Sequence, residues 1–210
     1  MNTTNRRRAP ATQGDGPPRP PRAARALTAA ATTVALVGSV SGCGLTGPAM
    51  NSGVEITEFT VTSPAFHDGK ELPARFACPK YPGGQGRTPP LRWSGAPSRT
   101  TRAFAIVMDD PDGSKGAHVG WVIVNIDGTT TELVEGARPE KAVEALNTSK
   151  KTTYVPPCPP RGERHRYRFT VYALSERLAL RQGAPLKEAL STIAEHTVGR
   201  GRITGYFGDA

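Results

Sequence analysis

The signatures of common enzyme active sites are missing from this chain of 210 residues. It has no GxSxG nucleophile elbow, no HExxH zinc motif, no P-loop and no GxGxxG dinucleotide-binding loop. CxxC spacing is also absent, and separated cysteines make a weak ligand set for zinc. We therefore expect a protein that is not an enzyme and that uses neither a metal nor a cofactor.

Long apolar runs and an evenly spread positive charge are lacking as well. Only residues 26–40 approach the ~20 apolar residues that a membrane-spanning helix needs, which excludes a multi-pass membrane protein. The formal net charge is +9, but residues 1–42 hold six arginines against the single acidic residue Asp15. The rest of the chain is close to balanced, so we expect no nucleic-acid partner.

The first residues are typical of an exported lipoprotein. An arginine-rich segment ends at Arg25 and is followed by the uncharged residues 26–40. The next tetrapeptide, Val40-Ser41-Gly42-Cys43, resembles the bacterial lipobox, in which a diacylglycerol is attached to the cysteine sulfur. An uncleaved anchor is the alternative, and Arg6-Arg7-Arg8 leaves the twin-arginine export route open.

These features divide the chain into three parts. We predict a signal peptide over residues 1–42, a lipidated tether over residues 43–53 that carries palmitate or a similar acyl chain on Cys43, and one domain over residues 54–210. The protein would then be anchored on the extracytoplasmic face of the cell membrane. In that oxidising compartment we expect Cys78 and Cys158 to form a disulfide, or at least to be adjacent, and a loop of this length would contribute ~4 kcal/mol.

Strand patterns dominate the predicted domain. Residues 103–108 and 121–126 are continuous apolar runs, typical of strands that are buried on both faces. Residues 166–174 alternate, and the parity change within residues 54–61 indicates a break or bulge. One helix is expected to begin near Pro185 and to end at Gly199, and residues 139–146 favour a short second helix. Many strands without βαβ alternation predict an antiparallel, mainly β domain.

Six short motifs occur in an order that resembles the phosphatidylethanolamine-binding protein family, and specifically its bacterial Raf-kinase-inhibitor-like branch. They are Ser63-Pro64-Ala65-Phe66, Pro89-Pro90-Leu91-Arg92-Trp93, Asp109-Asp110-Pro111-Asp112, Trp121 to Ile126, Cys158-Pro159-Pro160 and His165-Arg166-Tyr167. The resemblance covers about residues 55–207. It implies a β-sandwich of one large and one small antiparallel sheet with a C-terminal helix, and a small pocket for phosphate-like anions such as phospholipid head groups.

The pocket of the family can be carried over onto matching positions. Asp110 and Asp112 match its two carboxylates, and His165 and Tyr167 match its His-Arg-Tyr motif. Histidine and tyrosine can donate hydrogen bonds to an anion, and a nearby carboxylate favours the imidazolium. This chain has Gly120 where the family usually has a pocket histidine, so either His118 reaches in instead or one donor is lost.

The sequence is compatible with three candidate functions. The first is a lipid-anchored, non-enzymatic protein that binds a phosphate-like anion or a phospholipid head group. The second is an inhibitor of a protease or signalling protein that acts through loops around residues 79–97. The third, an enzyme using Asp110, His165 and Cys158, is disfavoured because no nucleophile has an activating base and Cys158 lies between prolines.

Overall fold

Three long strands form the centre of the domain. They are β5 (Ala103–Asp110), β6 (His118–Asp127) and β9 (Arg164–Leu174), in a computed structural model that describes residues 55–209. In β5 the apolar run buries side chains on both faces of the sheet. In β9 the alternating residues Tyr167, Phe169, Val171 and Ala173 share one buried face, as the sequence predicts.

The strands assemble into two sheets. The larger has the order β1-β10-β9-β5-β6-β8, with β3 also paired to β10, and the smaller has the order β2-β4-β7. The remaining bounds are β1 Thr57–Glu58, β2 Thr60–Thr62, β3 Lys70–Glu71, β4 Leu91–Ser94, β7 Glu132–Leu133, β8 Val143–Glu144 and β10 Thr197–Gly208. The predicted sandwich is confirmed, but the large sheet is mixed, because β1 and β3 both pair with β10 in parallel.

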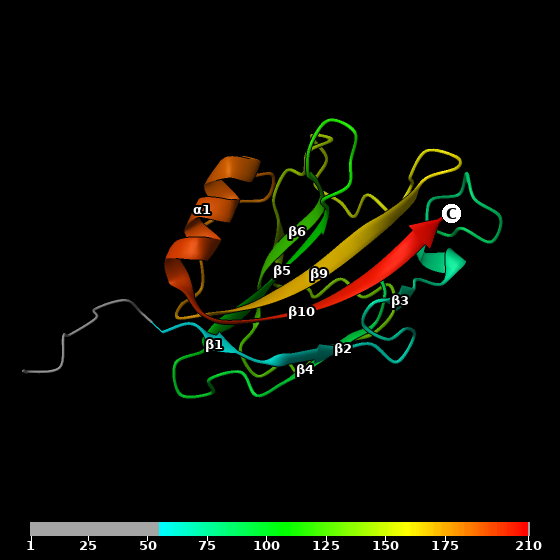
Figure 1. The fold of residues 1–210 in the computed structure, drawn as a ribbon. Coiled ribbons are helices and arrows are strands. Elements are labelled where there is room, and N and C mark those ends of the chain that lie inside the picture. Colours follow the sequence, from blue (N-terminus) through cyan, green and yellow to red (C-terminus); the bar gives the residue numbers. More distant parts are fainter. Residues whose placement is uncertain (1–54, 210) are drawn as a thin grey trace, which may run out of the picture. The chain divides into compact units, whose positions relative to one another are not determined.

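Each face of the large sheet is covered by a different layer. The smaller sheet packs on one face, and the aromatic residues Phe59, Trp93, Phe104 and Phe169 lie in the core between the sheets. The helix α1 (Leu186–His196) packs on the other face through Ala189 and Ile193. Figure 1 shows α1 and the strands β2 and β4 on opposite sides of the large sheet.

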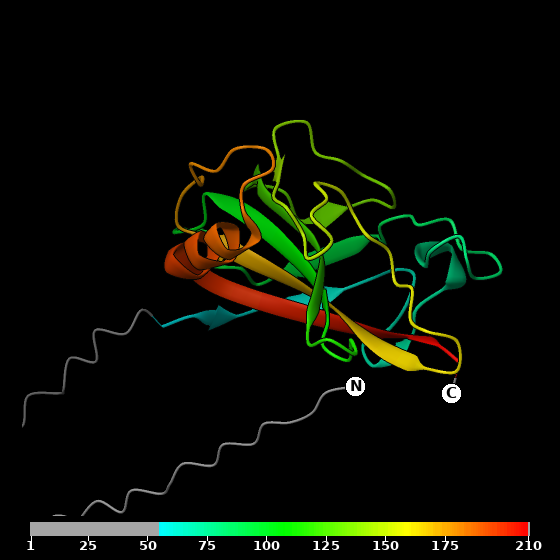
Figure 2. The ribbon, with the colours of Figure 1, turned by 90° about the horizontal axis from the view of Figure 1, so that it is seen from above.

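The last strand, β10, was not predicted from the sequence. Gly199 suggested the end of a helix, yet it lies with Gly201 and Gly205 in a strand of 12 residues that follows α1 directly. A Cβ atom at Gly201 would approach within 2.3 Å of the Phe59 carbonyl oxygen. Glycine is therefore required because the chain before β2 lies directly against the backbone of β10. Figure 2 shows α1 near one end of β9 and β10 and the loop before β9 at the other end.

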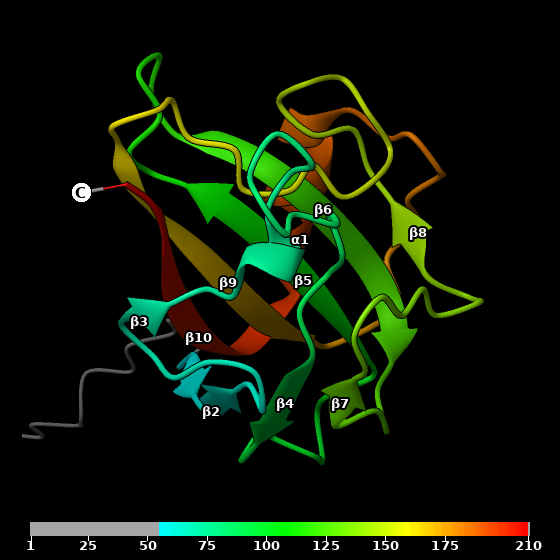
Figure 3. The same cartoon turned by 90° about the vertical axis from the view of Figure 1, so that its right-hand side faces the viewer.

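The helix predicted over residues 139–146 is wrong. Residues Val143 and Glu144 form β8, which pairs with Val124 and Ile123 at the edge of the large sheet. In β8 the segment pairs its backbone with β6. A helix of one or two turns would have to form its hydrogen bonds without a packed face, and such short helices are only marginally stable. Figure 3 shows β8 beside β6 at this edge. The one additional helical element within residues 55–209 is a short 3-10 turn, Ala74–Phe76.

The predicted break near residue 59 is present, since Phe59 separates β1 from β2. Within residues 55–209, no helix is long and apolar enough to cross a membrane. The predicted signal peptide, the lipidation site Cys43 and the tether over residues 43–53 lie outside the described residues.

Candidate functional site

The site lies where β5 ends and β6 begins. The strand β5 ends with Asp109 and Asp110. Its antiparallel register with β6 places Asp110 directly opposite His118. The strand β9 is the other neighbour of β5, and it carries His165 and Tyr167. Because side chains alternate along a strand, Met108 and Asp110 face the cavity side while Asp109 faces away. Local strand geometry therefore gathers residues from three strands.

An imidazole held between two carboxylates is the main feature of the site. The Nδ1 atom of His165 lies 2.8 Å from Asp110 Oδ2, and both residues are buried. Its Nε2 atom lies 2.9 Å from Glu163 Oε2. Carboxylates only accept hydrogen bonds, so this arrangement is fully satisfied when both ring nitrogens carry a proton.

The charge of His165 follows from these contacts. Burial lowers the pKa of His165, but the hydrogen bonds and charges of Asp110 and Glu163 together outweigh burial and raise it above its usual value of 6.5. Folding therefore favours the imidazolium. In this structure, however, neither ring N–H is free for an external anion, which differs from the expectation that His165 offers an open donor.

Tyr167 lies beside this histidine, with the two rings roughly parallel and their centroids 6.5 Å apart. Its hydroxyl is buried and has no hydrogen-bond partner among the described residues, although the Asp110 carboxylate and the backbone of Cys158 approach it. Burial first, and then the Asp110 charge, raise the pKa of Tyr167 far above its usual value of 10. Tyr167 therefore stays a neutral donor, and the nearby Asp110 carboxylate does not meet the geometry of a hydrogen bond with it, which is unusual for a buried polar group.

The carboxylate of Asp112 is directed elsewhere. It accepts hydrogen bonds from the backbone N–H of Arg166 at 2.8 Å and from its Nε atom at 2.9 Å. The Arg166 side chain, opposed in part by burial, lowers the pKa of Asp112 to about 2. Asp112 contacts the site through its backbone, since its N–H donates to Asp110 Oδ1 at 2.9 Å. Asp112 is not among the residues that line the cavity, so its role in ligand binding stays a prediction.

A cavity of about 370 Å³ adjoins these groups. Asp110, His118, His165 and Tyr167 all line it, so the structure brings four of the five predicted binding residues to one cavity. His118 is partly exposed and its Nε2 atom lies 3.0 Å from Ser149 Oγ. Lys115, from the loop between β5 and β6, adds an exposed cation to the lining. The cavity can therefore offer a cation, a histidine and a neutral hydroxyl to a ligand.

The position of the missing histidine is filled by Met108. A Cβ atom on Gly120 would lie 2.6 Å from Met108 Cε and 2.8 Å from the Val155 carbonyl oxygen. The methionine can move, but the backbone carbonyl cannot easily do so, because Val155 N also bonds to Gly120 O at 2.9 Å. A side chain at residue 120 is therefore excluded, and His118 lines the cavity without entering this space.

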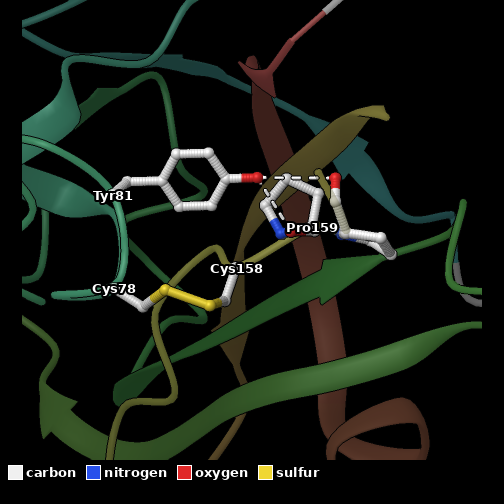
Figure 4. Close-up of a disulfide and its surroundings, with 5 residues drawn as sticks. Cys78, Tyr81, Cys158 and Pro159 are labelled. Carbon is white, nitrogen blue, oxygen red and sulfur yellow. Dashed lines mark hydrogen bonds between the residues drawn. A yellow bond between two sulfur atoms is a disulfide. The ribbon is translucent and has the colours of Figure 1, made fainter. Parts of the chain in front are cut away.

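A proline-rich segment, residues 155–160, forms one wall of the cavity, and we call it the strap. The structure contains the disulfide between Cys78 and Cys158, with their Cα atoms 5.4 Å apart. The hydroxyl of Tyr81 donates to the Pro159 carbonyl at 2.8 Å beside this disulfide (Figure 4). Cys158 lines the cavity, so the disulfide fixes part of the wall and not a remote loop.

Glu163 was not identified from the sequence, although a signal was present. It precedes His165 by two residues and Tyr167 by four, and residues at this spacing share one face of an extended chain. The alternation of β9 can be extended backward to include it. Within residues 55–209, no group of three histidine, cysteine or carboxylate side chains is arranged to hold a metal ion.

Comparisons with known proteins agree with this architecture. A family model described as phosphatidylethanolamine-binding protein matches residues 62–208. The UPF0098 protein of Methanothermobacter thermautotrophicus is 35% identical over 148 residues, which are 68% of this chain and 94% of that protein. The Mycobacterium tuberculosis protein named "Putative lipoprotein LppC" is 36% identical over 149 residues, 70% of this chain and 71% of that protein.

Solved structures show the same fold. The structure of Escherichia coli YbcL, described as a new member of the mammalian PEBP family, has a TM-score of 0.67 and 27% identity, and the match covers 73% of this chain and 100% of that one. With its two-sheet sandwich, its ordered motifs and these relatives, the chain belongs to the phosphatidylethanolamine-binding protein family.

Proposed function

We propose that this protein is a non-enzymatic binding protein, anchored by lipid at the outer face of the cell membrane, whose cavity takes a phosphate-type anion or a phospholipid head group. The family supports a binding role, and the relative named as a lipoprotein supports the anchor. The lipobox of this chain supports the same anchor.

The buried hydroxyl of Tyr167 is the observation that carries the proposal. Leaving a buried donor without a partner costs about 1–3 kcal/mol, so such groups are usually satisfied. Tyr167 belongs to the cavity wall, and a phosphate oxygen that reached its hydroxyl would accept its hydrogen bond. Lys115 and His118 line the same cavity and add positive charge or a further donor for the ligand.

The chain supplies a matched pair of tyrosines for the test. Tyr154 is also buried, and its hydroxyl has no partner within residues 55–209, but it does not line this cavity. In calorimetric titrations with phosphoethanolamine and with inorganic phosphate, Tyr167→Phe should weaken binding about tenfold, because it removes a hydrogen bond to a charged group. Tyr154→Phe should bind as the wild type does.

Two outcomes would contradict the proposal. Equal effects of the two substitutions would mean that Tyr167 does not contact the ligand. Absence of binding to the wild type between pH 6 and pH 8 would remove the head-group function and favour inhibition of a partner protein through the loops around residues 79–97.

A further inference from the structure

Glu163 occupies the Nε2 side of the His165 imidazole, next to the residues that line the cavity but not among them. Its Oε2 atom lies 2.9 Å from His165 Nε2, the distance of a charge-assisted hydrogen bond. His165 lines the cavity, and its other nitrogen is held by Asp110. A phosphate group can therefore gain a hydrogen bond from this imidazolium only by replacing one of the two carboxylates.

The two carboxylates differ in how readily they can leave. The side chain of Asp110 is 13% exposed and accepts a second hydrogen bond from the Asp112 N–H, so releasing His165 would leave a buried charge. The side chain of Glu163 is 50% exposed, so on release it would be solvated by water. Its backbone follows Gly162, which has a φ of 80° and has open space where a side chain would be. Glu163 is the partner that can be exchanged.

We propose that Glu163 is an internal competitor for the anion site, a carboxylate that binds His165 in the empty protein and is displaced by the phosphate group of the ligand. The proposal rests on the proposed function, because it assumes that a phosphate group enters this cavity. Under it, Glu163 lowers the affinity for every phosphate-type anion, whether free phosphate or a head group, and thereby sets the concentration at which the site fills.

The test compares Glu163→Gln with the wild type in calorimetric titrations with inorganic phosphate and, separately, with phosphoethanolamine. Glutamine keeps the size of the side chain but removes its charge, so it competes less well for the imidazolium. Phosphate should bind Glu163→Gln about tenfold more tightly, and Glu163→Ala at least as tightly as Glu163→Gln. A gain with phosphate alone would assign the site to free anions, and a gain with both probes to the shared phosphate group.

Glu71→Gln is the matched control. Glu71 pairs with Arg164, the residue next to His165, and its side chain is 63% exposed. Its substitution removes one negative charge from the same end of the sheet without a contact to the imidazole. It should leave phosphate affinity within about twofold of the wild type, since exposed charges act weakly at a distance.

The exchange also has a direct signature. In nitrogen NMR spectra of the wild type, the His165 Nε2 signal should shift when phosphate is added, because its partner changes, while the Nδ1 signal moves less. If all variants bind phosphate equally, or if Glu71→Gln matches Glu163→Gln, Glu163 is not a competitor although the binding function stands. If neither the wild type nor any variant binds either probe, the competitor and the binding function both fail.

Discussion

The two faces of the large sheet differ sharply at the end of β5. On the cavity face, Asp110 binds a histidine, His165. On the opposite face, the preceding residue Asp109 binds Arg168, its partner in the register of β5 and β9. Each aspartate is therefore paired across the same two strands, and only the partner differs.

This difference separates a fixed region from a responsive one. An arginine keeps its charge near neutral pH, so the Asp109 pair has no partner that switches there. A histidine can gain or lose its proton near neutral pH, so the Asp110 pair can change with pH or with a bound anion. Because side chains alternate along β5, the consecutive residues Asp109 and Asp110 form a structural ion pair on one face and a ligand-responsive pair on the other.

The largest expected effect concerns the covalent support of the cavity face. Replacing both Cys78 and Cys158 by alanine should lower the free energy of unfolding by up to about 4 kcal/mol, because the disulfide closes a loop with a sequence separation of 80 residues. Urea denaturation would measure the loss, and phosphate binding should weaken because Cys158 belongs to the cavity wall. Reduction of the wild type should reproduce both effects, since Cys158 is exposed. An unchanged denaturation midpoint would show that the strap is held by its other contacts.

The next effect tests whether the opposite face is purely structural. Asp109→Asn should lower the free energy of unfolding by about 2 kcal/mol, less than for a fully buried pair because the Arg168 side chain is 32% exposed. Phosphate affinity should not change. Asp112→Asn is the control, with an expected loss below about 1 kcal/mol, because its partner Arg166 is 49% exposed. Loss of phosphate binding in Asp109→Asn would remove the distinction between the faces.

The smallest effect is a dependence of stability on pH that arises from the cavity face alone. Because folding raises the pKa of His165, its stabilisation is present below the unfolded value of 6.5 and is lost as the pH rises through the raised value. One proton limits the slope to about 1.4 kcal/mol per pH unit. Asp112 does not contribute to this dependence, because the stabilisation from its lowered pKa is lost only in acid, as the pH falls from 3.8 toward 2. Urea denaturation between about pH 6 and pH 9 should therefore show a shallower slope in Glu163→Gln than in the wild type; equal slopes would contradict the role of Glu163.

Much of the fold could be predicted because its central strands have simple patterns. The apolar run of β5 and the alternation of β9 are local properties, and each corresponds to burial on two faces or on one. The strand β10 could not be predicted in this way, because its Gly201 is required by Phe59 and Val61, which lie far away in the sequence. The helix prediction for residues 139–146 failed for a similar reason, since pairing with β6 decides the structure of this segment.

The site was predictable to a similar degree. The motifs located Asp110, His165 and Tyr167 but could not show that Asp112 turns to Arg166, a contact that depends on the relative position of two strands. The role of Met108 beside Gly120 depends on packing between neighbouring strands and on the Val155 carbonyl. Glu163 had a local signal in its spacing from His165, but a proline-rich loop precedes it and obscured the strand pattern.

The position of β10 also governs the order in which the domain can be assembled. This strand lies between β9 and the short strands β1 and β3, and Arg200 in it pairs with Glu58, which lies 142 residues earlier in the chain. When the chain emerges with its N-terminus first, from a ribosome or through a membrane, β1 and β3 have no pairing partner until the 12-residue strand β10 appears. Before that moment, the edges of β1, β3 and β9 are open to other chains. The domain can close only after β10 has been delivered.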